Sequence, residues 1–120
     1  MPALPVVDPE TIRYLRELSP GDNGAFLREI IGIFIADTPL RIAELEESLR
    51  ASDAEKFARA AHSIKGSSAN LGAAALRAVA AQLEERSRVE PASTLGPLLE
   101  SLKAEYARAE AELRRQFPAR

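Results

Sequence analysis

The chain has 120 residues, 46% of them hydrophobic, which suits a single domain with one core. It contains no cysteine, which excludes disulfides and thiolate metal sites and favours a reducing, cytoplasmic location. The 16 basic and 18 acidic residues are spread along the chain without a basic block, and no apolar run could span a bilayer, so we expect neither a nucleic-acid nor a membrane partner.

The N-terminal part of the chain predicts a loose segment followed by a short helix. Residues 1–7 carry two prolines and are expected to form a flexible leader, and residues 8–117 a single domain. Asp8 can cap a helix that has Pro9 in its first turn. The apolar face of that helix is Ile12, Leu15 and Leu18. The turn-forming segment 19–24 ends it.

A second helix is predicted to begin near Asn23, with apolar residues recurring at spacings of three and four. These residues are Leu27, Ile30, Ile31, Phe34, Ile42, Leu45 and Leu49. Pro39 lies in the middle and is expected to kink or split the helix. The stretch SDAE at 52–55 has the form of a capping box with Ser52 at the cap, and it predicts the start of a third helix.

The remaining sequence predicts where the third helix ends, where the fourth ends and where the last helix runs. The third helix carries the stripe Phe57, Ala61, Ile64, Ser68 and Leu71. Gly72 can end it, a fourth helix then extends to a break at 89–94, and the last helix runs from about Thr94 toward Gln116. Four long amphipathic helices with short connections are typical of an antiparallel four-helix bundle. We therefore predict an all-α fold, a bundle of this kind with a short additional N-terminal helix.

The only histidine of the chain, His62, lies in the third helix. At about 100° of rotation per residue it points roughly 140° away from the apolar stripe, which predicts that it faces water. Lys65 and Arg59 lie within roughly 60° of it on the same helix. Gly66 also points away from the core, although a mid-helix glycine costs about 1 kcal/mol relative to alanine. An exposed histidine or a helical glycine alone is usually unremarkable, but together they indicate a site that leaves space for another molecule.

A neutral imidazole has a free lone pair on one ring nitrogen and can act as a nucleophile, for which a phosphoryl group is a suitable electrophile. Lys65 could neutralise the phosphoryl charge, with Arg59 as a second candidate. If the third and fourth helices form a hairpin, Gln82 or Glu84 comes level with His62. Either side chain could accept a hydrogen bond from the other ring nitrogen, and helical angles leave both open.

Other chemistries lack the residues that they need. One histidine without cysteine or a Glu-x-x-His spacing provides no metal ligand set. Neither a nucleophile elbow nor a glycine-rich phosphate loop is present, so we predict that the chain is not an enzyme and does not bind ATP. Any phosphoryl group must then come from another protein and pass to another.

The stretch AAHSIKGSSANLGAAAL, residues 60–76, resembles the signature of histidine-containing phosphotransfer domains: His, two residues, Lys-Gly, a small residue, Ser, and Leu-Gly shortly after. The likeness covers roughly residues 25–112. It implies that His62 accepts a phosphoryl group from a receiver-domain aspartate and donates it to another receiver, with Lys65 stabilising the phosphate. It also implies that Gly66 lets the receiver dock, and that the receiver supplies Mg²⁺, the chain having no cofactor of its own.

Some members of that family hold the histidine ring with a glutamine on the following helix. An ungapped comparison places Glu84 there, with Gln82 as the alternative. A carboxylate could accept the ring N–H but would repel the phosphate. The docking face implied by the resemblance consists of Ala58, Arg59, His62, Lys65, Gly66 and Ala69.

The partners that the resemblance implies are response-regulator receiver domains and a hybrid sensor kinase, and we expect a monomer. Two other interpretations stay open from sequence. One is a bundle of the same fold that sequesters a kinase or receiver without transferring phosphate. The other is a plain helical scaffold, which would leave the outward Gly66 and the exposed His62 without a purpose.

Overall fold

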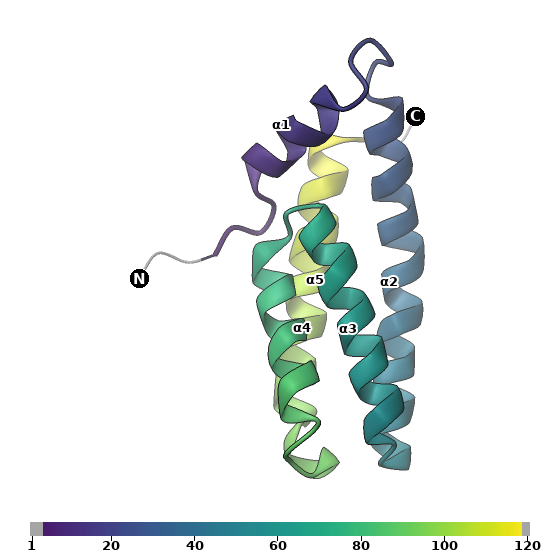
Figure 1. The fold of residues 1–120 in the computed structure, drawn as a ribbon, viewed down its shortest axis with the longest axis vertical. Helices are drawn as coiled ribbons and strands as arrows, with labels where there is room; N and C mark the ends of the chain where they lie inside the picture. The colour runs from purple at the N-terminus through teal and green to yellow at the C-terminus, as the bar shows by residue number, and fades with distance from the viewer. Residues whose placement is uncertain (1–3, 119–120) are drawn as a thin grey trace.

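The computed structural model describes residues 4–118, and over this range the chain is helical without strands. Its elements are α1 (Pro9–Glu17), α2 (Ala25–Ala51), α3 (Ala54–Asn70), α4 (Ala74–Arg86), a short 3₁₀ helix η1 (Ala92–Thr94) and α5 (Gly96–Gln116). Figure 1 shows α2 to α5 running in alternating directions along the long axis, with α1 across one end. Contacts join α2 to α3, α3 to α4, α4 to α5 and α5 back to α2, which confirms a four-helix bundle with an additional N-terminal helix.

The core lies between these four helices and is built mainly from leucine and alanine. Its fully buried large side chains are Leu27, Leu45, Ile64, Leu71, Leu76, Leu83, Leu95, Leu102 and Leu113. Small buried residues, Ala60 and Ala61 on α3 and Ala80 on α4, accompany the close packing of these two helices. Within residues 4–118 no helix combines the length and the apolar character needed to cross a membrane.

Pro39 does not split the second helix, because α2 continues as one element on both sides of it. Proline has no N–H, so the carbonyl of Ile35, four residues earlier, loses its helical partner. The hydroxyl of Tyr106 on α5 donates a hydrogen bond to that carbonyl at 3.2 Å. A tertiary contact thus satisfies the group that the proline leaves free.

The start of the third helix differs from the predicted capping box. Asp53, not Ser52, is the N-cap, and its Oδ1 accepts a hydrogen bond from the backbone N–H of Lys56 at 3.1 Å. Ser52 instead ends α2 in the left-handed conformation, with φ of +54°. The connection between the two helices is so short that one residue must reverse the chain while the next one caps.

The expected flexible leader is partly anchored. Residues 1–3 of it lie outside the described residues. Of the rest, Val7 is buried in the core, and the carbonyl of Pro5 accepts a hydrogen bond from the N–H of Ala75 at 3.1 Å. An apolar side chain and a backbone contact therefore place residues 5–7 against the start of α4.

Gly72 joins this N-terminal segment to the turn between α3 and α4. Its φ of +71° is the left-handed conformation expected of a glycine that ends a helix, which confirms the predicted stop. Its carbonyl accepts the N–H of Asp8 at 2.8 Å, and an added Cβ would lie 2.7 Å from the Cβ of Thr11. Glycine is needed here both for the turn and for the close approach of α1.

Candidate functional site

His62 lies on the outer face of α3, midway along the helix. Phe57, Ala61 and Ile64 of the same helix are buried, whereas 65% of the His62 side chain is exposed. This confirms the orientation predicted from helical periodicity. The imidazole is therefore accessible to a large partner, and its surroundings come from α3 itself and from the adjoining face of α4.

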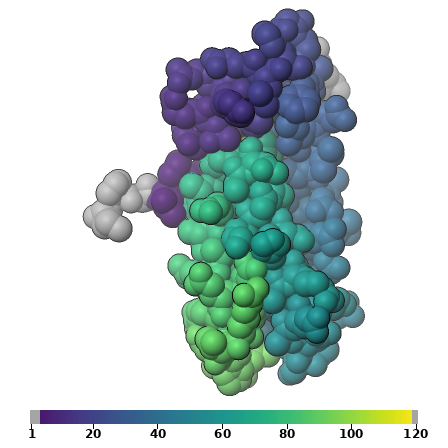
Figure 2. Space-filling model, viewed as in Figure 1, coloured from purple at the N-terminus to yellow at the C-terminus, as the bar shows by residue number. Residues whose placement is uncertain are grey.

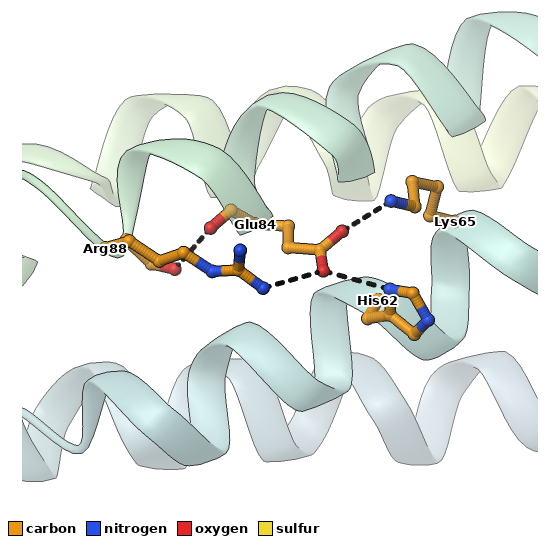
Figure 3. Close-up of polar contacts among 5 residues, drawn as sticks. His62, Lys65, Glu84 and Arg88 are labelled. Atoms are coloured by element: carbon orange, nitrogen blue, oxygen red, sulfur yellow. Dashed lines mark hydrogen bonds and ion pairs between the residues drawn. The ribbon is translucent and has the colours of Figure 1, made fainter.

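Glu84 of α4 reaches across to the ring. It follows Ala80 and Leu83 on the buried side of α4, and its side chain is only 9% exposed. Its Oε2 lies 2.9 Å from Nδ1 of His62, and its Oε1 lies 2.7 Å from Nζ of Lys65 (Figure 3). One carboxylate therefore holds the histidine ring and the neighbouring lysine together.

Arg88 completes this cluster and was missed by the sequence analysis. Its Nη2 lies 3.2 Å from Oε2 of Glu84, the same oxygen that contacts His62. The four-residue spacing from Glu84 to Arg88 puts the two side chains on one face of α4, and that spacing could have identified the arginine once Glu84 was placed. Two cations and one imidazole thus surround a single buried carboxylate.

These contacts hold the pKa of the Glu84 carboxyl below its usual value, chiefly because Lys65 donates a hydrogen bond to it. Burial acts in the opposite direction, and the contact with His62 adds to the lowering. Glu84 is therefore ionised at neutral pH. A carboxylate only accepts hydrogen bonds, so Nδ1 of His62 is the donor and Nε2 of the neutral ring carries the lone pair.

The remaining predicted residues fall into two groups. Ala58 and Arg59 line a hollow of about 750 Å³ together with His62, Glu84 and Arg88, and the Nη1 of Arg59 is paired with Glu55 at 3.2 Å. The second group is exposed and does not line this hollow, and it consists of Gly66, Ala69 and Gln82. Gln82 makes no hydrogen bond with the ring within residues 4–118, so of the two alternatives the structure brings Glu84 to His62.

Gly66 presents open space beside the site. A Cβ added there would meet no atom within 4 Å, so packing inside the protein does not require a glycine. In Figure 2, α3 and α4 form one continuous face that no other segment covers, with the N-terminal helix at its end. Over residues 4–118 no group of three His, Asp or Glu side chains is arranged to hold a metal ion.

Comparison with known proteins gives a consistent result. Residues 29–112 match the family model described as the Hpt domain. The chain is 29% identical over 79 residues to multistep phosphorelay regulator 1 of Schizosaccharomyces pombe. That stretch is 66% of this chain and 27% of the yeast protein, so the chain corresponds to about a quarter of that relative.

Two solved structures are similar over nearly the whole chain. Histidine-containing phosphotransfer protein B of Pseudomonas aeruginosa PAO1 matches with a TM-score of 0.80 and 26% identity, covering 95% of this chain and 96% of that one. The Hpt domain of a sensor hybrid histidine kinase from Shewanella has a TM-score of 0.70 and 18% identity, covering 93% and 100% of the two chains. The second likeness concerns the fold alone.

Proposed function

The chain belongs to the Hpt domain family, and on this premise we propose that His62 is the residue that carries the phosphoryl group in a phosphorelay. One observation supports this more than any other. The exposed ring donates Nδ1–H to Glu84, which leaves Nε2, the nucleophilic nitrogen, toward solvent. A fixed tautomer with an accessible lone pair is the state that an incoming phosphoryl group requires.

The phosphoryl group would come from the aspartyl phosphate of a receiver domain and pass to a second receiver. The receiver would also supply the Mg²⁺ that neutralises the oxygens during transfer. The chain itself would act as a carrier and not as an enzyme. We propose that it works in this way as a monomer in the cytoplasm, where receivers and hybrid sensor kinases have access to ATP-derived phosphate.

Lys65 is the cation that we assign to the phosphoryl group. Its ammonium is held beside the ring by the shared carboxylate of Glu84, and 30% of its side chain is exposed. It can turn from Oε1 toward phosphoryl oxygens without leaving the site, because lysine is a flexible point charge with three donors. Arg59 at the edge of the hollow is a second candidate.

The receiver would dock on the open face of α3 around His62. Ala58 and Ala69 expose small side chains there, and Gly66 exposes none, so the surface of a partner can approach the helix backbone closely. Arg59 would contribute a charge at the rim of the interface, where charges act mainly on the rate of association.

The decisive experiment incubates the protein with a phosphorylated receiver domain and Mg²⁺, in parallel with His62→Gln. We expect label on the wild type alone, stable in alkali and labile in acid, as a phosphohistidine is. Label on His62→Gln would remove the assignment. Receiver binding without label on the wild type would instead favour the module that sequesters its partner, and self-association without receiver binding would favour the scaffold.

A further inference from the structure

The residue that holds the phosphoacceptor ring carries a full negative charge. The carbonyl of a glutamine at position 84 could orient the ring equally well, because it also accepts a hydrogen bond from Nδ1. The carboxylate does more than orient, since it interacts far more strongly with a charged ring than with a neutral one. Its side chain is 9% exposed, so little solvent weakens this interaction.

Phosphoryl transfer changes the charge of the ring. When Nε2 attacks the phosphorus atom, the N–P bond forms and the P–O bond to the receiver breaks, with its electron pair leaving on the carboxylate. The ring keeps its proton on Nδ1 and becomes a phosphoimidazolium. In onward transfer the N–P bond breaks, its electron pair returns to Nε2, and a neutral imidazole leaves. If Nδ1 had lost its proton in between, the leaving group would be an imidazolate, which leaves far less readily.

From these changes in the charge of the ring, we propose that Glu84 is a positioning residue. Its negative charge keeps Nδ1 of phosphorylated His62 protonated, so that the phosphoryl group remains ready for transfer. This inference rests on the proposed function and adds to it. It resembles the part played by a carboxylate behind a catalytic histidine, which holds the tautomer and stabilises the imidazolium that forms. The distance of 2.9 Å between Oε2 and Nδ1 is suitable for such a charge-assisted hydrogen bond.

The other charged groups near the ring make this carboxylate necessary. Lys65, Arg59 and Glu55 come from α3, and Glu84 and Arg88 come from α4. Glu55 is paired with Arg59, and within residues 4–118 Glu84 is the acidic group that touches the imidazole. Without its charge, the surrounding cations would favour loss of the ring proton.

The test measures onward transfer from phosphorylated protein to a receiver as a function of pH, for wild type, Glu84→Gln and Glu55→Gln. Glu55→Gln removes a carboxylate from the same hollow without touching the ring, and it serves as the matched control. As the pH rises, the transfer rate of Glu84→Gln should begin to fall at least about one pH unit below the pH at which the wild-type rate falls. At mildly alkaline pH, Glu84→Gln should therefore transfer about tenfold more slowly than the wild type. The control should follow the wild-type profile.

A second measurement needs no variant. Nitrogen NMR of the phosphorylated wild type, with ¹⁵N in the imidazole, should show Nδ1 protonated to a higher pH than in free phosphohistidine. Identical pH profiles for wild type and Glu84→Gln, or a ring that titrates like the free compound, would overturn the inference while leaving the relay intact. An unlabelled wild type would instead mean that the proposed function itself is wrong.

Discussion

Among the lysine–glutamate contacts between neighbouring helices, two have nearly the same distance but differ in their surroundings. Lys65 of α3 meets Glu84 of α4 at 2.7 Å, and Lys103 of α5 meets Glu46 of α2 at 3.0 Å. The Glu84 side chain is 9% exposed and also binds an imidazole and an arginine, whereas that of Glu46 is 38% exposed. An ion pair alone therefore does not identify a functional site. The burial of Glu84 and its additional partners distinguish the Lys65–Glu84 pair from a surface ion pair that contributes little to stability.

The two outward-facing glycines of the long helices offer the same contrast. Gly66 on α3 and Gly32 on α2 are both exposed, and a Cβ would meet nothing within 4 Å at either. Gly66 lies on the helix of His62, whereas Gly32 lies in a shallow hollow beside Arg114 and Phe117 of the C-terminal region. Equal local geometry therefore predicts equal effects on helix stability but unequal effects on phosphotransfer.

Among changes to these two ion pairs, the largest effect is expected from Lys65→Ala. Loss of the cation beside the phosphoryl group should slow transfer from a phosphorylated receiver by about tenfold or more, because a charge-assisted contact in the transition state is removed. Loss of His62 should abolish it. Lys103→Ala, the matched control on α5, should transfer like the wild type. Single-turnover labelling measures all three, and equal rates for Lys65→Ala and Lys103→Ala would contradict the role given to Lys65.

A smaller effect is expected when the glycines are replaced. Gly66→Gln should slow transfer several-fold by obstructing receiver docking, while Gly32→Gln should leave it unchanged. Both changes should raise thermal stability slightly, by up to about 1 kcal/mol, since glycine is a poor helix former. Transfer measured beside thermal unfolding separates the two consequences. If Gly66→Gln transferred at the wild-type rate, steric access would not explain this glycine.

The smallest effect on function is expected from Tyr106→Phe on the supporting side of the bundle. It removes the hydroxyl that donates to the carbonyl of Ile35, so the free energy of unfolding should fall by about 1 kcal/mol. The ring contact with Phe34, with centroids 5.7 Å apart, can remain. Denaturant unfolding should show this loss with phosphotransfer unchanged. A change in the transfer rate would mean that α2 and α5 influence the site more directly than their contacts indicate.

Much of the site could be predicted because the direction in which each side chain leaves a helix follows from its position in the sequence of that helix. The apolar stripe of α3 determined that His62 faces outward, and the spacing within the helix placed Lys65 and Gly66 near it. The choice between Gln82 and Glu84 could not be made in the same way. It depends on the rotation of α4 against α3, which is set by the packing of core side chains between the helices and not by either sequence alone.

Three further features required contacts between segments far apart in the chain. Pro39 was expected to kink or split its helix, but α2 is not split, and Tyr106 from another helix satisfies the carbonyl that the proline leaves free. Residues 1–7 were expected to be loose, but the carbonyl of Pro5 accepts a hydrogen bond from the N–H of Ala75 at the start of α4. Arg88 is an exposed arginine, and it belongs to the site only because its partner Glu84 reaches the imidazole of His62 on another helix.

The sequence by itself determined the helices, their order, the likeness to a phosphotransfer family and the exposed histidine, because periodicity, turn residues and a short motif are local properties. Only the tertiary structure decided which carboxylate holds the ring, which tautomer results and which cations share that carboxylate. These depend on the register of α4 against α3, where a shift of one residue would turn Glu84 away from His62 by about 100°.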